Sequence, residues 1–222
     1  MNPMDGNLIR FNKTAKFCFI DIETYNLCLN LAFNIPWQIS TISYTGDQTP
    51  EEHDMLVKWP PREYCTIKKE IALLNHHNQE EIDRKGISPQ DAFKIIDEKL
   101  QEADYIVGHN ILGFDIYLIR GIYRLAGKDW KFIMPKVIDT RSLAQGLKTN
   151  HKYDGKSNFL AYEYSMINHR VRGVKTNLKF LAQEYNIPFD ESKLHNSLYD
   201  LTVNIALWNK LKYEIELSMT PP

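Results

Sequence analysis

Two acidic residues, Asp21 and Glu23, stand two positions apart at the end of residues 16–22, the most apolar stretch of the chain. The aromatic and β-branched residues of this stretch predict a strand that is buried on both faces. Because side chains alternate along a strand, both carboxylates point to the same face. Two unit charges about 4 Å apart at an effective dielectric constant near 20 repel by about 4 kcal/mol. A semi-buried pair therefore needs a cation or a proton, whereas a polar strand end, the alternative interpretation of this pair, needs neither.

Three further residues with the same kind of chemistry come later in the chain. Asp115 follows a predicted strand at residues 105–109 and lies in the first turn of the next helix, where the helix dipole alone favours a carboxylate. Asp200 lies in a predicted last helix, residues 197 to about 211, close to its buried face. His195 precedes that helix by two residues. A lone histidine is most often a surface or core residue, so its significance depends on these acidic neighbours.

The predicted elements favour an α/β fold with a central mixed β-sheet flanked by helices. Strands at residues 37–44 and 53–59, joined by a turn, predict an antiparallel meander. Strands at 105–109 and 137–139 then alternate with helices, among them one from about residue 112 to residue 126. Asn78 and Ser88 are expected to cap two earlier helices. A meander followed by strand and helix alternation is typical of a mixed sheet with helices on its faces.

Composition predicts one soluble domain spanning residues 1–222. Hydrophobic residues make up 43% of the chain and charged residues 25%, which excludes global disorder. The net charge is −1, so any site for a polyanion must be local. Three cysteines without Cys-x-x-Cys spacing argue against a disulfide framework or a zinc knuckle and favour a cytoplasmic location. No apolar run approaches the roughly 18 residues of a membrane span, and no signal-peptide core is present, so we expect no membrane partner.

Residues 146–176 have no clear periodicity and are expected to form a basic insertion within this domain. The segment carries six cationic and four aromatic side chains: Lys148, Lys152, Lys156, Arg170, Arg172, Lys175, Tyr153, Phe159, Tyr162 and Tyr164. Such a set can follow a single strand by phosphate pairing and base stacking. A solvated or dimerising excursion is the equally weighted alternative. On the first interpretation Arg170, Arg172 and Lys175 bind substrate.

The order Asp21-x-Glu23, Asp115, His195-x4-Asp200 resembles the DEDDh branch of the 3′-to-5′ exonucleases. This is the DnaQ-like family, which includes the replicase proofreading subunit and belongs to the ribonuclease H-like superfamily. Supporting matches are the three residues that precede the Asp115 region and two longer segments: Gly108-His109-Asn110, residues 137–144 and residues 177–188. The DEDDy branch would require Tyr at the position of Asn196.

The resemblance implies a ribonuclease H-like fold and a metal-dependent nuclease site. Asp21, Glu23, Asp115 and Asp200 would bind two Mg²⁺ or Mn²⁺ ions, and His195 would be the general base. Hard-oxygen ligands and a neutral imidazole suit these two tasks. The implied activity is the release of nucleoside 5′-monophosphates from the free 3′ end of single-stranded DNA. The expected substrate contacts are Ile22, Thr24, Tyr25, His109, Asn110 and Phe114.

Two alternatives and two departures accompany this interpretation. An RNA exonuclease of the same fold would carry the same motifs, because they do not read the 2′-OH. A catalytically silent nucleic-acid-binding module is disfavoured because all five catalytic residue types are present. Relatives often carry Thr-Gly where this chain has Tyr25-Asn26, and Tyr25 could stack on a base. The chain ends soon after the last predicted helix, which leaves polymerase association unsupported.

Overall fold

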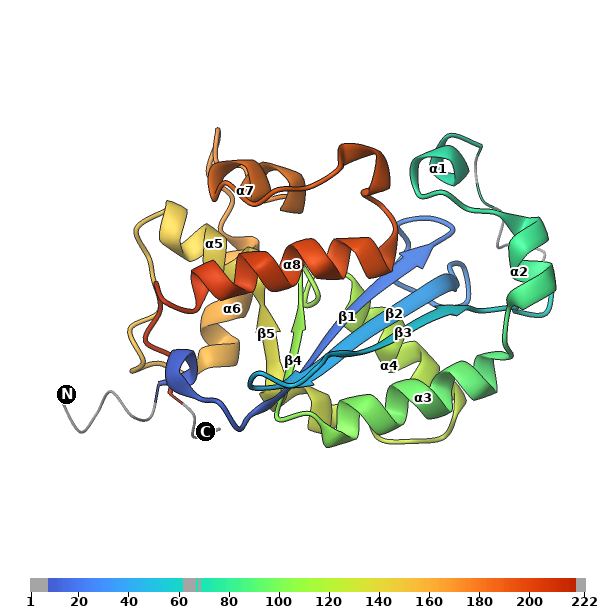
Figure 1. Cartoon of the computed structure of the whole chain (residues 1–222), viewed down its shortest axis with the longest axis horizontal. Coiled ribbons are helices and arrows are strands. Elements are labelled where there is room, and N and C mark those ends of the chain that lie inside the picture. Colours follow the sequence, from blue (N-terminus) through green and yellow to red (C-terminus); the bar gives the residue numbers. More distant parts are fainter. Residues whose placement is uncertain (1–7, 62–66, 68, 219–222) are drawn as a thin grey trace.

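A five-stranded mixed sheet forms the centre of the protein. The computed structural model describes residues 8–61, 67 and 69–218. The strands lie in the order β3-β2-β1-β4-β5 (Figure 1). Their bounds are Lys16–Thr24 for β1, Pro36–Thr45 for β2, Glu51–Leu56 for β3, Tyr105–Gly108 for β4 and Val137–Asp139 for β5. β1, β2 and β3 form the predicted antiparallel meander, and β4 and β5 join it in parallel. The predicted mixed α/β sheet is therefore confirmed.

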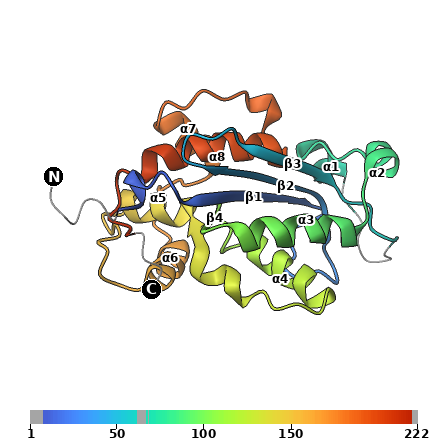
Figure 2. The ribbon, with the colours of Figure 1, turned by 60° about the horizontal axis from the view of Figure 1, so that its bottom comes forward.

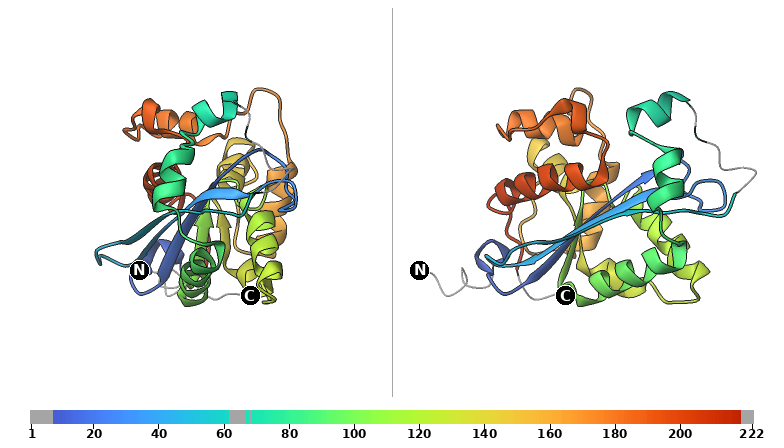
Figure 3. Two further views of the ribbon diagram at one scale, coloured as in Figure 1. Left: turned by 90° about the vertical axis from the view of Figure 1, so that its right-hand side faces the viewer. Right: turned by 45° about the vertical axis from the view of Figure 1, so that its right-hand side comes forward.

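Helices cover both faces of the sheet (Figures 2 and 3). Four of them share a hydrophobic core with β1, and their bounds are Pro89–Glu102 for α3, Asp115–Leu125 for α4, Thr140–Lys148 for α5 and Ser197–Leu211 for α8. Cys18, Ile20 and Ile22 of β1 belong to the core that includes α3 and α4. Phe17 and Phe19 belong to the core that includes α5 and α8. Since side chains two apart share a face, Asp21 and Glu23 continue the Phe17 and Phe19 face toward α8.

The described residues form further helices. They are α1 at Lys69–Leu74, α2 at Gln79–Lys85, α6 at Phe159–Asn168, α7 at Leu178–Glu184, and the 3-10 turns Ile9–Phe11, Lys131–Lys136 and Glu191–Lys193. The predicted caps are confirmed, because the Asn78 side chain accepts from the Glu81 N–H and Ser88 accepts from the Asp91 N–H. None of the helices in the described part of the chain is long and apolar enough to cross a membrane.

One predicted helix start is shifted and another is confirmed. α4 begins at Asp115 and not near residue 112, because Asn110 adopts a left-handed φ of 68° and its carbonyl accepts from the Gly113 and Phe114 N–H groups in a tight turn. α8 begins at Ser197 as predicted, and its cap is Asn196, whose side chain accepts from the Tyr199 N–H. Each of these helices carries an acidic residue of interest in its first turn.

The segment at residues 146–176 is more ordered than its sequence indicates. It contains α6, which packs against α5 and β5. The Tyr153 ring is buried and contacts Phe159 and Tyr162 at centroid distances of 4.9 and 5.1 Å. These aromatic side chains therefore pack on one another and against the core. Periodicity failed here because α6 lies between the two cores, so apolar residues surround it and no single stripe develops.

Glu163 of α6 is a fully buried acid with one hydrogen-bonded oxygen. Its Oε1 accepts from the Asp139 N–H at 2.6 Å, while Oε2 is buried and has no partner among the described residues. Burial, and then the charge of Asp139, raise the pKa of Glu163 well above its usual range. The shift favours the neutral form of the side chain, which joins α6 to the end of β5.

The neutral state of Glu163 predicts that Glu163→Gln keeps the fold. The amide oxygen can still accept from the Asp139 N–H, so we expect a loss below about 1 kcal/mol in unfolding free energy. Glu163→Ala removes the acceptor and leaves a cavity, and should cost about 2–4 kcal/mol. Denaturant unfolding of both variants tests this. Equal losses in the two would mean that Glu163 acts through its charge.

Candidate active site

Three distant parts of the sequence bring the predicted acidic residues together. β1 supplies Asp21 and Glu23, the first turn of α4 supplies Asp115, and the first turn of α8 supplies Asp200. Asp115 and Asp21 each raise the pKa of Glu23, and Asp21 also raises that of Asp115. Each carboxylate therefore lies within electrostatic reach of others, at the end of β1.

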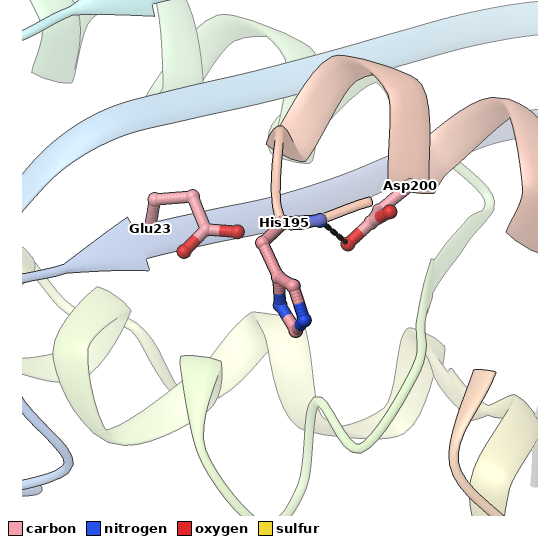
Figure 4. A group of neighbouring side chains, drawn as sticks. All are labelled: Glu23, His195 and Asp200. Carbon is pink, nitrogen blue, oxygen red and sulfur yellow. Dashed lines mark hydrogen bonds between the residues drawn. The ribbon is translucent and has the colours of Figure 1, made fainter. Parts of the chain in front are cut away.

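Glu23, His195 and Asp200 are the closest members of this cluster (Figure 4). Each offers one ligand atom, and these atoms all lie within 4.8 Å of one another. Among the residues that the structure describes, Asp21 and Asp115 are not part of that closest group. The sequence analysis assigned the four carboxylates to the metal ions and His195 to the general base. In the structure, the His195 ring lies beside two of these carboxylates, those of Glu23 and Asp200.

Burial dominates the electrostatics of the carboxylates. Burial, and then the charge of Asp200, raise the pKa of Asp21 to about 8. Burial also raises the pKa of Asp200 to about 6, and raises the pKa values of Glu23 and Asp115 well above their usual range. These shifts mean that the protein alone does not provide enough positive charge or hydrogen bonding to keep all four groups ionised.

The residues present fit a divalent cation. Asp115 Oδ1 and Asp200 Oδ1 are buried, and neither has a hydrogen-bond partner among the described residues. Buried polar atoms are rarely left unpaired, so these oxygens indicate a missing ligand. Carboxylate oxygens are hard donors of the kind that Mg²⁺ and Mn²⁺ prefer. Asp21, Glu23, Asp115 and Asp200 would hold such ions.

His195 occupies a constrained backbone position. Its φ is 67°, in the left-handed region that L residues seldom adopt. Its N–H donates to Asp200 Oδ2 at 3.1 Å (Figure 4). Desolvation, and then the charge of His76, lower the pKa of His195 below its usual value. A lowered pKa favours the neutral imidazole, which is the form that can accept a proton.

Hydrogen bonds to β2 hold the first turn of α8. Ser40 Oγ and Ser197 Oγ are 2.5 Å apart, and Ser40 Oγ donates to Asp54 Oδ1 at 2.7 Å. Gln38 Nε2 donates to the same oxygen at 2.8 Å. All of these groups lie on β2 or β3 except Ser197. The network therefore fixes the helix end that carries Asp200 against the middle of the sheet.

His109 and Asn110 have internal hydrogen-bond partners. His109 Nε2 donates to the Thr176 carbonyl at 2.9 Å, and Nδ1 lies 3.0 Å from Thr140 Oγ1. Burial lowers the pKa of His109 to about 4, which favours the neutral ring. Asn110 Oδ1 accepts from Arg141 Nη1 at 2.6 Å. These contacts hold the turn before Asp115 in place, and the contacts of both residues to substrate stay a prediction.

The other residues predicted to contact substrate differ in how far their side chains are exposed to solvent. Ile22 is buried in the core, and Phe114 packs against the same core. Thr24 is buried and its hydroxyl donates to the Asn26 carbonyl at 2.6 Å. The Tyr25 ring packs against His77 at a centroid distance of 5.2 Å.

Three cations of the predicted basic segment are exposed: Arg170, Arg172 and Lys175. The Nζ atom of Lys175 lies 4.7 Å from the centre of the Phe180 ring.

Asp139 is a supporting residue that the sequence reasoning missed. Its fully buried carboxylate accepts from four backbone N–H groups, those of Asn110, Leu112, Arg141 and Ser142, at 2.9–3.1 Å. It thereby caps α5 and holds the turn that leads to Asp115. A strand followed at once by a helix predicts a capping residue at that junction, and Asp is a favoured cap. This signal could have identified it.

Asn75 is the second residue that was missed. Its Nδ2 donates to the Thr24 carbonyl at 3.1 Å, and its side chain acts to lower the pKa of Glu23. The residue comes directly after α1, in a part of the sequence with no motif. No sequence signal pointed to it.

Comparison with known proteins identifies the family. A family model described as exonuclease, of the RNase T type, matches residues 18–208. The chain belongs to this exonuclease family. The matched range includes all five residues of the predicted site, and the sequence-based assignment to the exonucleases is confirmed. No curated protein sequence matches the chain.

Solved structures of exonuclease I share the fold. The zinc-bound Escherichia coli exonuclease I complex with single-stranded DNA matches with a TM-score of 0.68 and 18% identity, over 90% of this chain and 41% of that one. The E. coli enzyme in complex with a dT13 oligonucleotide gives the same values. A product-bound exonuclease I gives a TM-score of 0.67 and 17% identity, over 91% and 44%. The chain thus spans about two fifths of the length of these structures, and the predicted ribonuclease H-like fold is confirmed.

Carboxylate repulsion predicts how the metal-free protein responds to pH. Asp21 has a pKa of about 8 in the folded state against about 4 when unfolded, so the folded state binds the extra proton between these values. Stability from this group is then fully present below about pH 4 and is lost as the pH rises from there to about 8. Asp21→Asn should raise the melting temperature of the metal-free protein at pH 8.5, by about 2–4 °C for each kcal/mol of repulsion removed. Mg²⁺ should stabilise the wild type more at pH 8.5 than at pH 5.5.

Thermal unfolding with and without Mg²⁺ measures both effects. Glu52→Gln, which neutralises an exposed carboxylate on β3, is the matched control and should change neither melting temperature nor its Mg²⁺ dependence. A metal-free Asp21→Asn protein less stable than wild type at pH 8.5 would contradict the repulsion.

Proposed function

We propose that this chain is a metal-dependent 3′-to-5′ exonuclease that releases nucleoside 5′-monophosphates from single-stranded DNA. The observation that carries the proposal is the grouping of Glu23, His195 and Asp200 at the end of β1, with Asp21 and Asp115 within electrostatic reach of these acids. This constellation lies on the fold of an exonuclease family. The similar exonuclease I structures bind single-stranded oligonucleotides, which supports this substrate class.

The division of labour follows from the environments of the side chains. Two divalent cations held by the four carboxylates would stabilise negative charge on the attacking and leaving oxygens of the phosphodiester. His195 in its neutral form accepts a proton from the attacking water through its imidazole. The Asp200 carboxylate holds the backbone N–H of His195, so the same residue that helps to bind a cation also fixes the base.

The loop at residues 169–177 supports binding of a polyanion. His109 Nε2 holds the Thr176 carbonyl, which ties this loop to the turn before Asp115. Arg170, Arg172 and Lys175 are exposed on it. We infer that these cations supply the local positive charge that a chain of net charge −1 otherwise lacks.

Digestion of 5′-labelled single-stranded DNA tests the proposed function. With Mg²⁺ or Mn²⁺ we expect a ladder that shortens stepwise from the 3′ end, and chelation should abolish it. Asp21→Asn should be inactive although its fold is retained. A matched RNA oligonucleotide decides the sugar preference, and digestion of RNA alone would transfer the proposal to an RNA exonuclease. Products from internal cleavage, or activity that survives chelation, would contradict it.

His195→Ala should lower kcat by about 10²-fold or more with a small change in KM, because a general base acts mainly in the transition state. Wild-type kcat should fall as the pH drops through the lowered pKa of His195, below about 6.5, since the protonated ring cannot accept. His151→Ala, at an exposed histidine after α5, is the control and should keep wild-type turnover. Equal rates in His195→Ala and wild type from pH 5 to 9 would remove His195 from the chemistry.

Replacing Arg170, Arg172 and Lys175 with Ala should weaken binding of single-stranded DNA and reduce its salt dependence. Each lost phosphate contact lowers the slope of log affinity against log salt by about 0.7. Lys152→Ala with Lys156→Ala, two exposed cations of the same segment outside this loop, provides the control. An unchanged salt slope in the triple variant would show that the loop does not touch the strand.

A further inference from the structure

The residues that follow α1 form a short bridge between the end of β1 and the loop that carries His195. This α1–α2 turn consists of residues 75–78. Asn75 Nδ2 donates to the Thr24 carbonyl. The His77 ring packs edge-on against Trp37 as well as Tyr25, at centroid distances of 5.2 Å. In Figure 1, α1 lies beyond the end of β1. The turn is therefore anchored to the sheet on both sides of His76.

His76 reaches from this anchored turn to the His195 loop. Its Nε2 is 3.0 Å from the carbonyl oxygen of Leu194, to which it donates a hydrogen bond. His76 and Asn196 also line the same two surface pockets, so the turn and the loop face each other around this bond.

The hydrogen bond from His76 restrains the peptide group between Leu194 and His195, which a second hydrogen bond also holds. The Leu194 carbonyl accepts from His76, and the N–H of the same peptide, that of His195, donates to Asp200. With both ends held, the plane of this peptide cannot rotate freely. Because His195 has a left-handed φ of 67°, the orientation of that plane decides where its side chain leaves the backbone.

The backbone conformation at His76 favours glycine, so the presence of a histidine side chain there needs another explanation. Its φ is 56°, and the His77 N–H donates to the Ala72 carbonyl at 2.9 Å, which is the pattern of a helix C-terminus that usually ends in Gly. Glycine would adopt this conformation without steric cost. The histidine is therefore not explained by the local geometry of the turn.

We propose that His76 is a positioning residue, which orients His195 by holding the Leu194 carbonyl. The role rests on the proposed function, because His195 is the group whose orientation matters. His76 acts through His195 and needs no contact with the substrate. Its imidazole is exposed to solvent on its other side, so the bond can be removed without opening the core.

His76→Gly is the sharpest variant, because it removes the imidazole and favours the observed backbone. We expect kcat on single-stranded DNA to fall by about tenfold to 10²-fold with KM changed less than threefold, as for a misplaced reacting group. The melting temperature should not fall. His76→Gln carries an amide that can reach the same carbonyl, and it should restore most of kcat. A wild-type kcat in His76→Gly, or no recovery with Gln, would overturn the proposal.

Asn150→Gly is the matched control. Asn150 has a φ of 60° in the turn after α5, and the His151 N–H donates to the Gly146 carbonyl in the same pattern as after α1. The change is chemically comparable but lies outside the proposed site, so kcat should stay at the wild-type value.

A double-mutant cycle separates positioning from a general effect. If His76 acts through His195, then His76→Gly should lower kcat no further in a His195→Ala background. Equal fold-losses in both backgrounds would overturn the proposal.

Amide hydrogen exchange tests the geometry without reference to activity. The His195 amide should exchange faster in His76→Gly than in wild type, and Asn150→Gly should leave it unchanged. If the wild type digests no nucleic acid, the proposed function fails while this result still decides whether His76 holds the loop. Unchanged exchange at His195 would refute that hold.

Discussion

Like-charge repulsion at the end of β1 is the constraint on which the rest of the site depends. The alternation of β1 sends Asp21 and Glu23 to the face of α8, and the first turns of α4 and α8 add two more acidic residues. Burial turns this proximity into raised pKa values for all four. Keeping these four acidic groups together destabilises the folded protein. A divalent cation that binds among them would relieve the repulsion, so the site suits such a ligand.

Much of the surrounding structure serves to hold the acidic residues in place. Asp139 gathers four backbone N–H groups and so fixes the turn before Asp115. The Ser40–Ser197 contact fixes the first turn of α8 against β2. α6 supports the first of these contacts, because Glu163 hydrogen-bonds to the backbone of Asp139. The precision that catalysis requires thus comes from neutral or internally paired groups next to the charged cluster.

The sequence was informative where a single local rule decides the outcome. Strand alternation placed Asp21 and Glu23 on one face, and side-chain caps at Asn78 and Ser88 marked helix starts correctly. It failed where two surfaces compete, as in α6, whose apolar residues divide between two cores and leave no stripe. It was silent where a side chain pairs with a residue distant in the sequence. The side chains of His109 and Asn110 hydrogen-bond to Thr176 and Arg141, which only the folded chain brings near.

The most direct test of the account is a count of the protons released when a divalent cation binds. Titration calorimetry with Mn²⁺ in buffers of different ionisation enthalpy gives this number. Since burial raises the pKa of Asp21 to about 8 and of Asp200 to about 6, the metal-free site holds protons at pH 7 that a cation must displace. We expect roughly one proton or more to be released at pH 7 and almost none at pH 9.5, with the release at pH 7 reduced in Asp21→Asn. Tight Mn²⁺ binding with no proton release at pH 7 would contradict the central claim that carboxylate repulsion defines this site.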